Sequence, residues 1–184
     1  MSQRLNIITG NRHERMPLLS EELKRQNIIN YTFWPAVYKK TAKEGINAAH
    51  KQIVEYAKLA EFPEVLIAED DFLGTHPDSF KFFLSQKPKK YDLYLSQVYL
   101  GELDKANKVK SFTGMTMYFV SEKYYDLFLS ADPQEHIDRA LSEIGGDFHV
   151  CNPFAFIQRN GFSSNTGKHE NYDSLLQNRK LFGG

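Results

Sequence analysis

The sequence contains little of what marks several specialised classes of protein. Cys151 is its only cysteine, so no disulfide can form within the chain, and no base is spaced to make this thiol a nucleophile. Acidic and basic residues balance at 23 each, which argues against the basic surface that binds nucleic acid or anionic membranes. No apolar run approaches the roughly 20 residues of a membrane-spanning helix.

The first residues also lack an apolar run long enough for a signal peptide. These absences predict a cytoplasmic protein with no nucleic-acid partner and no integral membrane span, although a peripheral membrane contact is compatible with them. No internal repeat or low-complexity linker divides the 184 residues, which suffice for one domain with a real core. Aromatic residues are abundant, with 14 Phe and 10 Tyr available to fill that core.

Strand and helix patterns alternate along the first half of the chain. Short apolar or alternating runs predict strands at 5–9, 31–37, 64–68, 91–100, 114–120 and 148–158. Helical patterns predict a helix with Pro17 in its first turn, helices at 44–60, 76–86 and 122–130, and one from an N-cap at Asp132 to Gly145. We therefore expect a single α/β domain over 1–184, with helices on the faces of a sheet and a polar tail from about residue 161 that contains one short helix.

Three acids, Glu69, Asp70 and Asp71, follow directly on the predicted strand 64–68. In open α/β sheets ligands bind beyond the carboxyl ends of the strands, so these carboxylates lie where a site is expected. Carboxylate oxygens suit Mg²⁺ or Mn²⁺, and a bound cation would relieve the repulsion among them. A solvated turn is the competing interpretation, because Asp is common where strands pass into loops.

The polar loop 10–15 follows the first predicted strand and is expected at the same edge of the sheet. It contains Asn11, Arg12, His13 and Arg15. Arginine side chains suit the geometry of phosphate oxygens, so the loop is a candidate for recognising a phosphate or nucleotide. A solvated basic turn would explain the same residues equally well.

Two further residues have both a structural and a functional interpretation. His50 lies on the apolar stripe of the helix 44–60, where a hydrogen-bonded core histidine is more common than a catalytic one. Asp138 lies early in a short helix, where the helix dipole favours an acid, but an inverting group transfer also needs a carboxylate as its base. Spacing alone does not prefer Asp138 over Asp147 for that role.

Five blocks along the chain carry a family resemblance. They are LNIITGNRHERM from residue 5, INYTFWPAVY from 29, EGINAAHKQIVEYA from 44, VLIAEDDF from 65, and a closing block made of GMTMYFVSEKYYDLFL, HIDRAL and FAFIQRNGFSSN. No single block is specific, but their order over most of the chain resembles the family 25 glycosyltransferases, the lipopolysaccharide and collagen galactosyltransferase-like group.

The resemblance implies a GT-A fold, which is a Rossmann-like, mixed but mostly parallel sheet with helices on both faces. It implies an enzyme that uses Mn²⁺ or Mg²⁺ to move a hexose, in the first place galactose, from a nucleotide-sugar such as a UDP-sugar. The acceptor would be a glycan or a glycolipid of the lipopolysaccharide type, and the transfer would invert the anomeric carbon.

The resemblance also implies roles for residues of this sequence. Asp71 would bind the metal that bridges the diphosphate, and Asp138 would be the catalytic base. Glu69 or Asp70 would orient the ribose or metal-bound water. The remaining donor-binding positions carried over from the family are Thr9, Asn11, Arg15 and His50, of which His50 would line or support the donor pocket.

Other functions stay open at this point. Ala49 stands where the family usually has Ser, and the segment before its helix is short, so a catalytically silent nucleotide-sugar or glycan-binding module of the same fold is an alternative. A metal-dependent phosphohydrolase also uses clustered carboxylates, but it usually recruits them from several segments. The charges of the tail, Lys168, His169 and Arg179, suggest that the tail folds over the donor phosphates.

Overall fold

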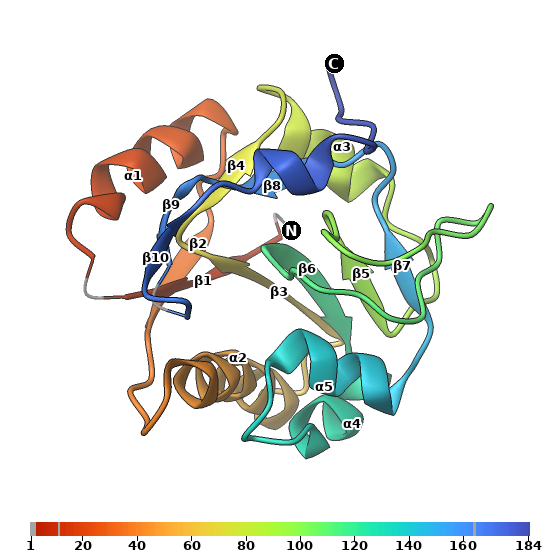
Figure 1. The fold of residues 1–184 in the computed structure, drawn as a ribbon. Coiled ribbons are helices and arrows are strands. Elements are labelled where there is room, and N and C mark those ends of the chain that lie inside the picture. Colours follow the sequence, from red (N-terminus) through yellow and green to blue (C-terminus); the bar gives the residue numbers. More distant parts are fainter. Residues whose placement is uncertain (1–2, 11, 164) are drawn as a thin grey trace.

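The computed structural model describes residues 3–10, 12–163 and 165–184. Its centre is a six-stranded sheet in the order β2-β1-β3-β6-β5-β7 (Figure 1). The strands are β1 (Leu5–Thr9), β2 (Tyr31–Pro35), β3 (Glu64–Glu69), β5 (Leu93–Leu95), β6 (Met117–Ser121) and β7 (Phe148–Val150). β6 runs antiparallel to both of its neighbours, and the other pairings of this sheet are parallel. The sheet is therefore mixed and mostly parallel, as the resemblance implied.

Helices cover both faces of this sheet (Figure 1). α1 (Arg15–Arg25) and α3 (Ser79–Ser85) lie over one face, whereas α2 (Ala42–Leu59), α4 (Tyr125–Ser130) and α5 (Ile137–Ile144) lie over the other. A short 3₁₀ turn, η1 (Glu122–Tyr124), leads into α4. Within the described ranges, no helix has both the length and the apolar character needed to cross a membrane.

The strands divide the apolar core into two layers because successive side chains point to opposite faces. In β3, Val65 and Ile67 pack with the α2 layer, whereas Leu66 and Ala68 pack with the α1 layer. All four side chains are buried. A strand covered on both faces is expected to be apolar throughout, and the predicted buried strand at 64–68 is confirmed.

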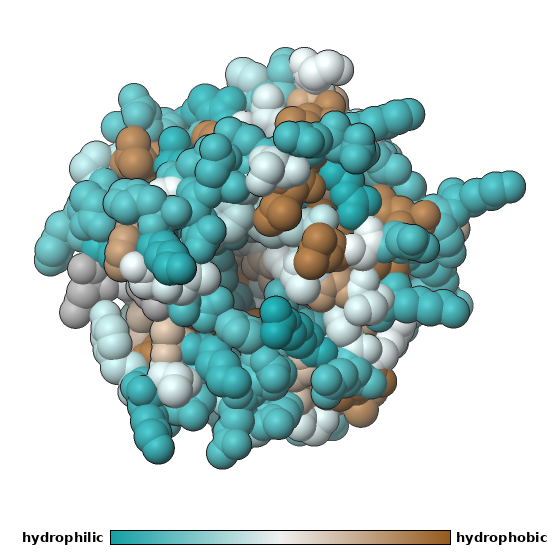
Figure 2. All heavy atoms as spheres, in the orientation of Figure 1, coloured by the Kyte–Doolittle hydropathy of each residue, from teal (hydrophilic) through white to brown (hydrophobic). Residues whose placement is uncertain are grey.

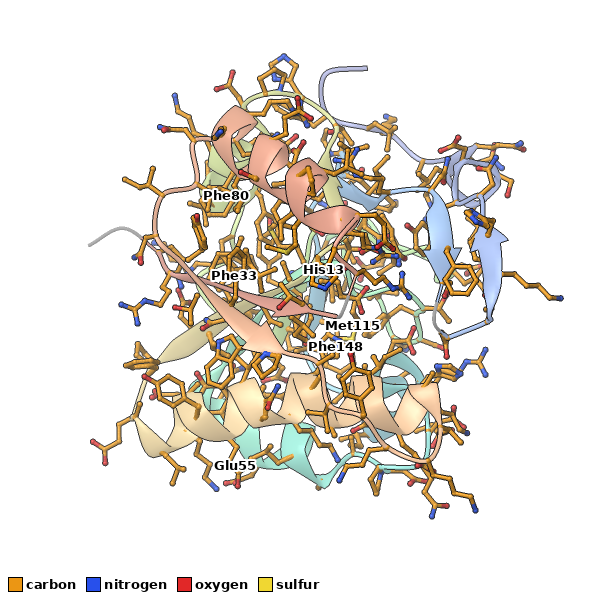
Figure 3. The ribbon with its side chains drawn as sticks, turned by 90° about the vertical axis from the view of Figure 1, so that its left-hand side faces the viewer. His13, Phe33, Glu55, Phe80, Met115 and Phe148 are labelled. Atoms are coloured by element: carbon orange, nitrogen blue, oxygen red, sulfur yellow. The ribbon has the colours of Figure 1, made fainter. Side chains whose placement is uncertain are left out.

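α2 has the predicted amphipathic pattern and begins with a capping box. Thr41 Oγ1 accepts a hydrogen bond from the Glu44 N–H, and the Glu44 carboxylate accepts one from the Thr41 N–H, both at 3.3 Å. Ala49 and His50, from the predicted apolar stripe, are buried. Glu55 projects from the opposite side of the helix, away from the sheet (Figure 3). The predicted helix is thus confirmed in both its extent and its buried face.

The N-cap predicted at Asp132 is wrong. α5 begins only at Ile137, with His136 as its N-cap residue. The Asp132 backbone carbonyl instead accepts a hydrogen bond from the buried Asn47 amide of α2 at 2.9 Å. A turn held in place by α2 therefore replaces the first turn of the expected helix. The predicted end of this helix at Gly145 is confirmed, and the glycine has a φ of 78° there.

The predicted extended segments at 91–100 and 148–158 are each only partly strand. The first contains β5, and beyond it the Ser96 N–H still donates to the Met117 carbonyl at 2.9 Å, but the regular ladder ends. The second is divided into β7 and β8 (Phe156–Gln158). β8 pairs antiparallel with β4 (Phe72–Gly74), the strand that directly follows the three acids.

The tail from Gly161 folds as a hairpin followed by one short helical segment. The hairpin pairs β9 (Gly161–Ser163) with β10 (Lys168–Glu170), and the segment is the 3₁₀ turn η2 (Asp173–Leu176). The short helix was predicted and the hairpin was not, because strands of three residues carry too little periodicity to be recognised.

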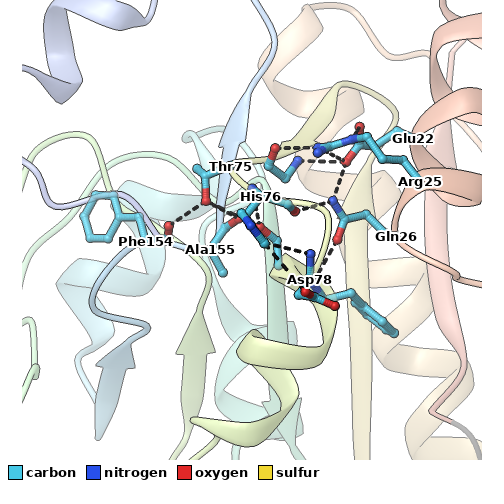
Figure 4. A network of polar contacts seen from close by, with 11 residues as sticks. Glu22, Arg25, Gln26, Thr75, His76, Asp78, Phe154 and Ala155 are labelled. Atoms are coloured by element: carbon cyan, nitrogen blue, oxygen red, sulfur yellow. Dashed lines mark hydrogen bonds and ion pairs between the residues drawn. The ribbon is translucent and has the colours of Figure 1, made fainter. Parts of the chain in front are cut away.

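A polar network fastens α1 to the end of β4 (Figure 4). Oε1 of the buried Glu22 accepts hydrogen bonds from the Gly74 N–H at 2.9 Å and from Gln26 Nε2 at 3.0 Å. Arg25 Nε donates to the other oxygen of Glu22, also at 2.9 Å. The network fixes the position of α1, and the first turn of that helix carries Arg15.

Candidate functional site

The three acids lie at the carboxyl end of β3, but they face different surroundings. The Glu69 side chain is 30% exposed and lies on the α2 side, next to His50. Asp70 and Asp71 are buried, with only 9% and 5% of each residue exposed. Burying two adjacent carboxylates is unfavourable unless positive charge or hydrogen bonds compensate it. A simple solvated turn therefore does not describe these residues.

Arg15 supplies part of the compensating charge. Its Nη1 lies 2.6 Å from Asp70 Oδ1 and 2.9 Å from Asp71 Oδ2. The Gly10 N–H donates a second hydrogen bond to Asp70, to Oδ2 at 3.2 Å. The loop 10–15 therefore meets the acids directly, as expected for segments that follow two adjacent parallel strands.

Asp71 has one satisfied carboxylate oxygen and one unsatisfied oxygen. Oδ2 accepts from Arg15 and from Gln158 Nε2, the latter at 3.0 Å, whereas the buried Oδ1 has no hydrogen-bond partner among the described residues. Burial, and next the charge of Glu69, raise the pKa of Asp71 from 3.8 to about 7, against the opposing effect of Arg15. An unpaired buried oxygen is unfavourable, and a bound cation or hydrogen-bond donor would satisfy it.

His50 connects Glu69 to the core. Its Nδ1 lies 2.6 Å from the Tyr118 hydroxyl, and its Nε2 lies 3.4 Å from Glu69 Oε1. Only 1% of His50 is exposed, so its ring is surrounded by other protein groups. Of the two roles that the resemblance allows, lining the donor pocket or supporting it, this geometry fits the second.

Asp138 lies at the same edge of the sheet as the acids. Its Oδ2 accepts from the Gly114 N–H and its Oδ1 from the Arg139 N–H, both at 2.9 Å. Gly114 lies just before β6, and the chain there reaches Glu69, whose N–H donates to the Thr116 carbonyl at 2.9 Å. One side of the site is thus built from α5 and the start of β6.

Asp147 lies at the opposite edge of the sheet. Its carboxylate contacts Lys108 Nζ at 2.6 Å and His149 Nε2 at 3.1 Å, and its carbonyl accepts from the Asp92 N–H at 2.8 Å. Asp92 directly precedes β5, so this contact marks the amino end of that strand. The structure therefore separates the two aspartates that spacing could not distinguish, although the base role itself stays a prediction.

Gln158 and Tyr99 bridge the acids and the Asp138 side. Gln158, at the end of β8, donates to Asp71 through its side chain. Its backbone N–H donates to the Tyr99 hydroxyl at 3.0 Å. Gln158 belongs to the closing block FAFIQRNGFSSN, which gave this residue no partner, and nothing in the sequence singled out Tyr99.

Three more of the predicted residues are Thr9, Asn11 and Arg179. The Thr9 hydroxyl donates to the Trp34 carbonyl at 3.3 Å, so it ties β1 to β2. Asn11 lies outside the described residues. Arg179 of the tail donates to the Gly101 carbonyl at 2.7 Å and to the Tyr99 carbonyl at 3.3 Å, so it holds the chain that follows β5.

The hairpin β9–β10 is the part of the tail that reaches the arginine loop. Arg15 Nη2 donates to the Phe162 carbonyl at 2.8 Å, and Arg12 Nη1 donates to the same oxygen. The face shown in Figure 2 is hollowed near its centre, where Figure 1 shows β3 and β6 with this hairpin to their left, and hydrophilic residues form most of the rim. A second groove of about 890 Å³ lies apart from the acids, between the loop 100–113 and Gly146–Phe148.

The acids could hold a hard cation only together with the phosphates of a bound substrate. Within the described ranges, no group of three or more metal-ligating side chains is assembled. Mg²⁺ is usually held by one or two carboxylates together with substrate phosphates and water, so a three-residue cluster is not required. The unpaired Oδ1 of Asp71 is one suitable ligand, and the Asp70 carboxylate beside it is a second.

Comparisons with known proteins identify the fold but no family. The chain matches no protein-family model, and no curated protein matches it. Among solved structures, HddC from Yersinia pseudotuberculosis is 17% identical with a TM-score of 0.53, over 85% of this chain and 72% of that one. A197 from STIV is 12% identical with a TM-score of 0.54, over 86% of this chain and 95% of that one.

A third solved structure is a mutant of a Drosophila β-1,4-galactosyltransferase 7 in complex with manganese, UDP-Gal and xylobiose. It is 13% identical with a TM-score of 0.54, and the match covers all of this chain (100%) and 83% of that one. At such low identity these likenesses show the fold alone. The chain has the mixed α/β architecture of GT-A and nucleotidyltransferase-like proteins.

Proposed function

We propose that the protein is a metal-dependent glycosyltransferase that moves a hexose, galactose or a similar sugar, from a UDP-sugar to a glycan or glycolipid acceptor. The observation that supports this most is the unpaired, buried Oδ1 of Asp71 among the three acids at the end of β3. The galactosyltransferase of similar fold holds manganese and UDP-Gal, which is the ligand chemistry that such carboxylates suit.

Asp71, with Asp70 beside it, would hold the Mn²⁺ or Mg²⁺ ion. When bound, the cation supplies charge neutralisation for the diphosphate leaving group. Arg15 already contacts both carboxylates, so its guanidinium lies where it can also contact a phosphate oxygen. Glu69 is held by His50 and stays partly exposed, so it can accept a hydrogen bond from a ribose hydroxyl.

The order of three groups across the site suggests how the substrates bind. The arginine loop follows β1, the acids follow β3, and Asp138 reaches the site from beyond β6. The nucleotide then occupies the β1 side, the diphosphate lies at the acids, and the transferred sugar points toward Asp138. This order agrees with ligand binding at the carboxyl ends of strands in open α/β sheets.

In the proposed reaction Asp138 acts as the general base. Its carboxylate takes the proton of the acceptor hydroxyl while the acceptor oxygen attacks the anomeric carbon. The new carbon–oxygen bond forms as the bond to the diphosphate oxygen breaks, and the nucleoside diphosphate leaves with the electron pair. Because attack and departure occur on opposite faces, the anomeric carbon is inverted.

A ligand panel tests the proposal. The protein is incubated with UDP-galactose, UDP-glucose and other nucleotide-sugars, with Mn²⁺ or with chelator, and both nucleotide release and melting temperature are measured. Stabilisation that needs the metal, with slow release of UDP by hydrolysis or transfer, is the expected result. Metal-dependent stabilisation without turnover would favour the silent binding module, and no response to any nucleotide-sugar would refute both. Turnover of a simple phosphate ester alone would favour the phosphohydrolase.

A further inference from the structure

Two stacked tyrosines lie beside the acids: Tyr99 packs on Gly114 next to Asp138, and Tyr172 lies near Ser163 of β9. The rings of Tyr99 and Tyr172 have their centroids 5.1 Å apart and are inclined by only 16°. Tyr99 follows β5 and is buried, whereas Tyr172 belongs to the tail and is half-buried. Residues 73 positions apart in the sequence (172 − 99) thus form one aromatic pair.

Tyr99 is fixed between the two functional groups of the site. Its hydroxyl accepts from the N–H of Gln158, whose side chain donates to Asp71. The ring packs closely on Gly114, where an added Cβ would lie 2.6 Å from Tyr99 Cδ2. The N–H of the same glycine donates to Asp138. Tyr99 therefore spans the distance between the acids and Asp138.

Tyr172 is held over Tyr99 by polar contacts within the tail. Its N–H donates to Asn160 Oδ1 at 2.8 Å, and Asn160 Nδ2 donates to Asp173 Oδ2 at 3.0 Å. The Ser163 side chain lies near the Tyr172 hydroxyl. Burial, and then the charges of Asp71 and Glu69, raise the pKa of the Tyr172 hydroxyl to about 12, which agrees with its placement near these acids.

The position of the two tyrosines indicates which part of the substrates they can contact. The arginine loop lies on the β1 side of β3, whereas Tyr99 comes from β5 on the other side. In the strand order, β3 and β6 separate a nucleobase at β1 from Tyr99, which follows β5. A sugar that approaches Asp138 would lie beside them.

We propose that Tyr172 forms a stacking platform for a pyranose ring of the saccharide acceptor, with Tyr99 as its rigid support. The weakly positive C–H hydrogens on one face of a pyranose are attracted to the negative face of an aromatic ring. In this proposal the Tyr172 hydroxyl, with the Ser163 side chain near it, bonds the hydroxyls of the sugar. This inference rests on the proposed function and specifies its acceptor side.

Saturation-transfer NMR with simple pyranosides tests the platform. The probes are methyl β-D-galactopyranoside, methyl β-D-glucopyranoside and xylobiose, each added to protein with UDP and Mg²⁺. We expect saturation of ring C–H signals in the wild type and in Tyr172→Phe, which keeps the ring. Tyr172→Ala should weaken probe binding by roughly three- to tenfold, the range of a single aromatic contact. The UDP affinity measured by calorimetry should be equal in all three proteins.

Leu175→Ala is the matched control, because it truncates an apolar side chain that is 42% exposed in the same tail segment. It should bind the probes like the wild type, which separates loss of the ring from general loosening of the tail. A wild type that binds UDP but no pyranoside, or a Tyr172→Ala protein that binds them normally, would refute the platform while leaving the proposed function intact. Loss of UDP affinity in Tyr172→Ala would also refute it. A wild type that binds no nucleotide would refute the proposed function itself.

Discussion

The carboxylate of Asp71 is the least satisfied charged group of the site. One oxygen is bonded by Arg15 and Gln158, and the other has no partner within the described part of the chain. Burial raises the pKa of this group well above its ordinary range. Such a group stabilises the folded protein little until a cation or a proton occupies it.

This has a consequence for stability in the absence of metal. The pKa of Asp71 is about 7 in the folded protein and 3.8 as a free side chain, so the folded chain keeps a proton that the unfolded chain releases. Its contribution to stability therefore falls as pH rises from about 4 to about 7. Melting curves in chelator at pH 5 and 7.5 should show a smaller loss of stability for Asp71→Asn than for the wild type. An equal loss in both proteins would contradict the assignment.

The proposed base role of Asp138 gives a separate prediction for the rate of sugar transfer. Asp138→Asn should leave UDP-sugar binding unchanged and lower the transfer rate by about 10²- to 10⁴-fold, the usual contribution of a general base. Asp147→Asn is the matched control, because Asp147 lies at the amino end of β5 and contacts Lys108. Transfer rates and donor affinities of both variants check this. A similar loss of transfer in Asp147→Asn would argue against the assignment.

Among the helices and strands, those with a periodic apolar pattern could be predicted from the sequence. Those fixed by contacts with distant segments could not. β3 and α2 have long apolar patterns, so their extents follow from periodicity. The start of α5 does not, because the Asp-Pro pattern at 132–133 is recruited into a turn that Asn47 bonds from α2. The hairpin β9–β10 depends on Arg12 and Arg15 of a distant loop, which no local pattern reveals.

The anchoring of α1 gives a prediction at the scale of a single element. Glu22→Ala would leave the Gly74 N–H and the Gln26 amide each without one acceptor, at a cost of about 1–3 kcal/mol in the free energy of unfolding. Glu21→Ala removes an exposed acid from the same helix turn and should change stability little. Urea unfolding of both variants measures the difference. Equal stability would show that the buried network does not hold α1 in place.

In the molecule as a whole, the order of the strands in the sheet brings the residues of the site together. It places the segments after β1 and β3 side by side and brings α5 to their other side. Residues at strand ends, such as Arg15 and Asp71, could be predicted because the carboxyl edge of a sheet follows from the element order. Gln158 and Tyr172 could not, since Gln158 contacts Asp71 from 87 positions away along the chain and Tyr172 contacts Tyr99 from 73 positions away.

The direct test of the central claim is calorimetric titration of the wild type and Asp71→Asn with UDP-galactose, in Mn²⁺ and in chelator. We expect the wild type to bind in Mn²⁺ and to lose this binding in chelator, and Asp71→Asn to show no metal-dependent binding. Wild-type binding that is equal in Mn²⁺ and in chelator, or metal-dependent binding that survives in Asp71→Asn, would show that Asp71 does not hold a metal for the donor.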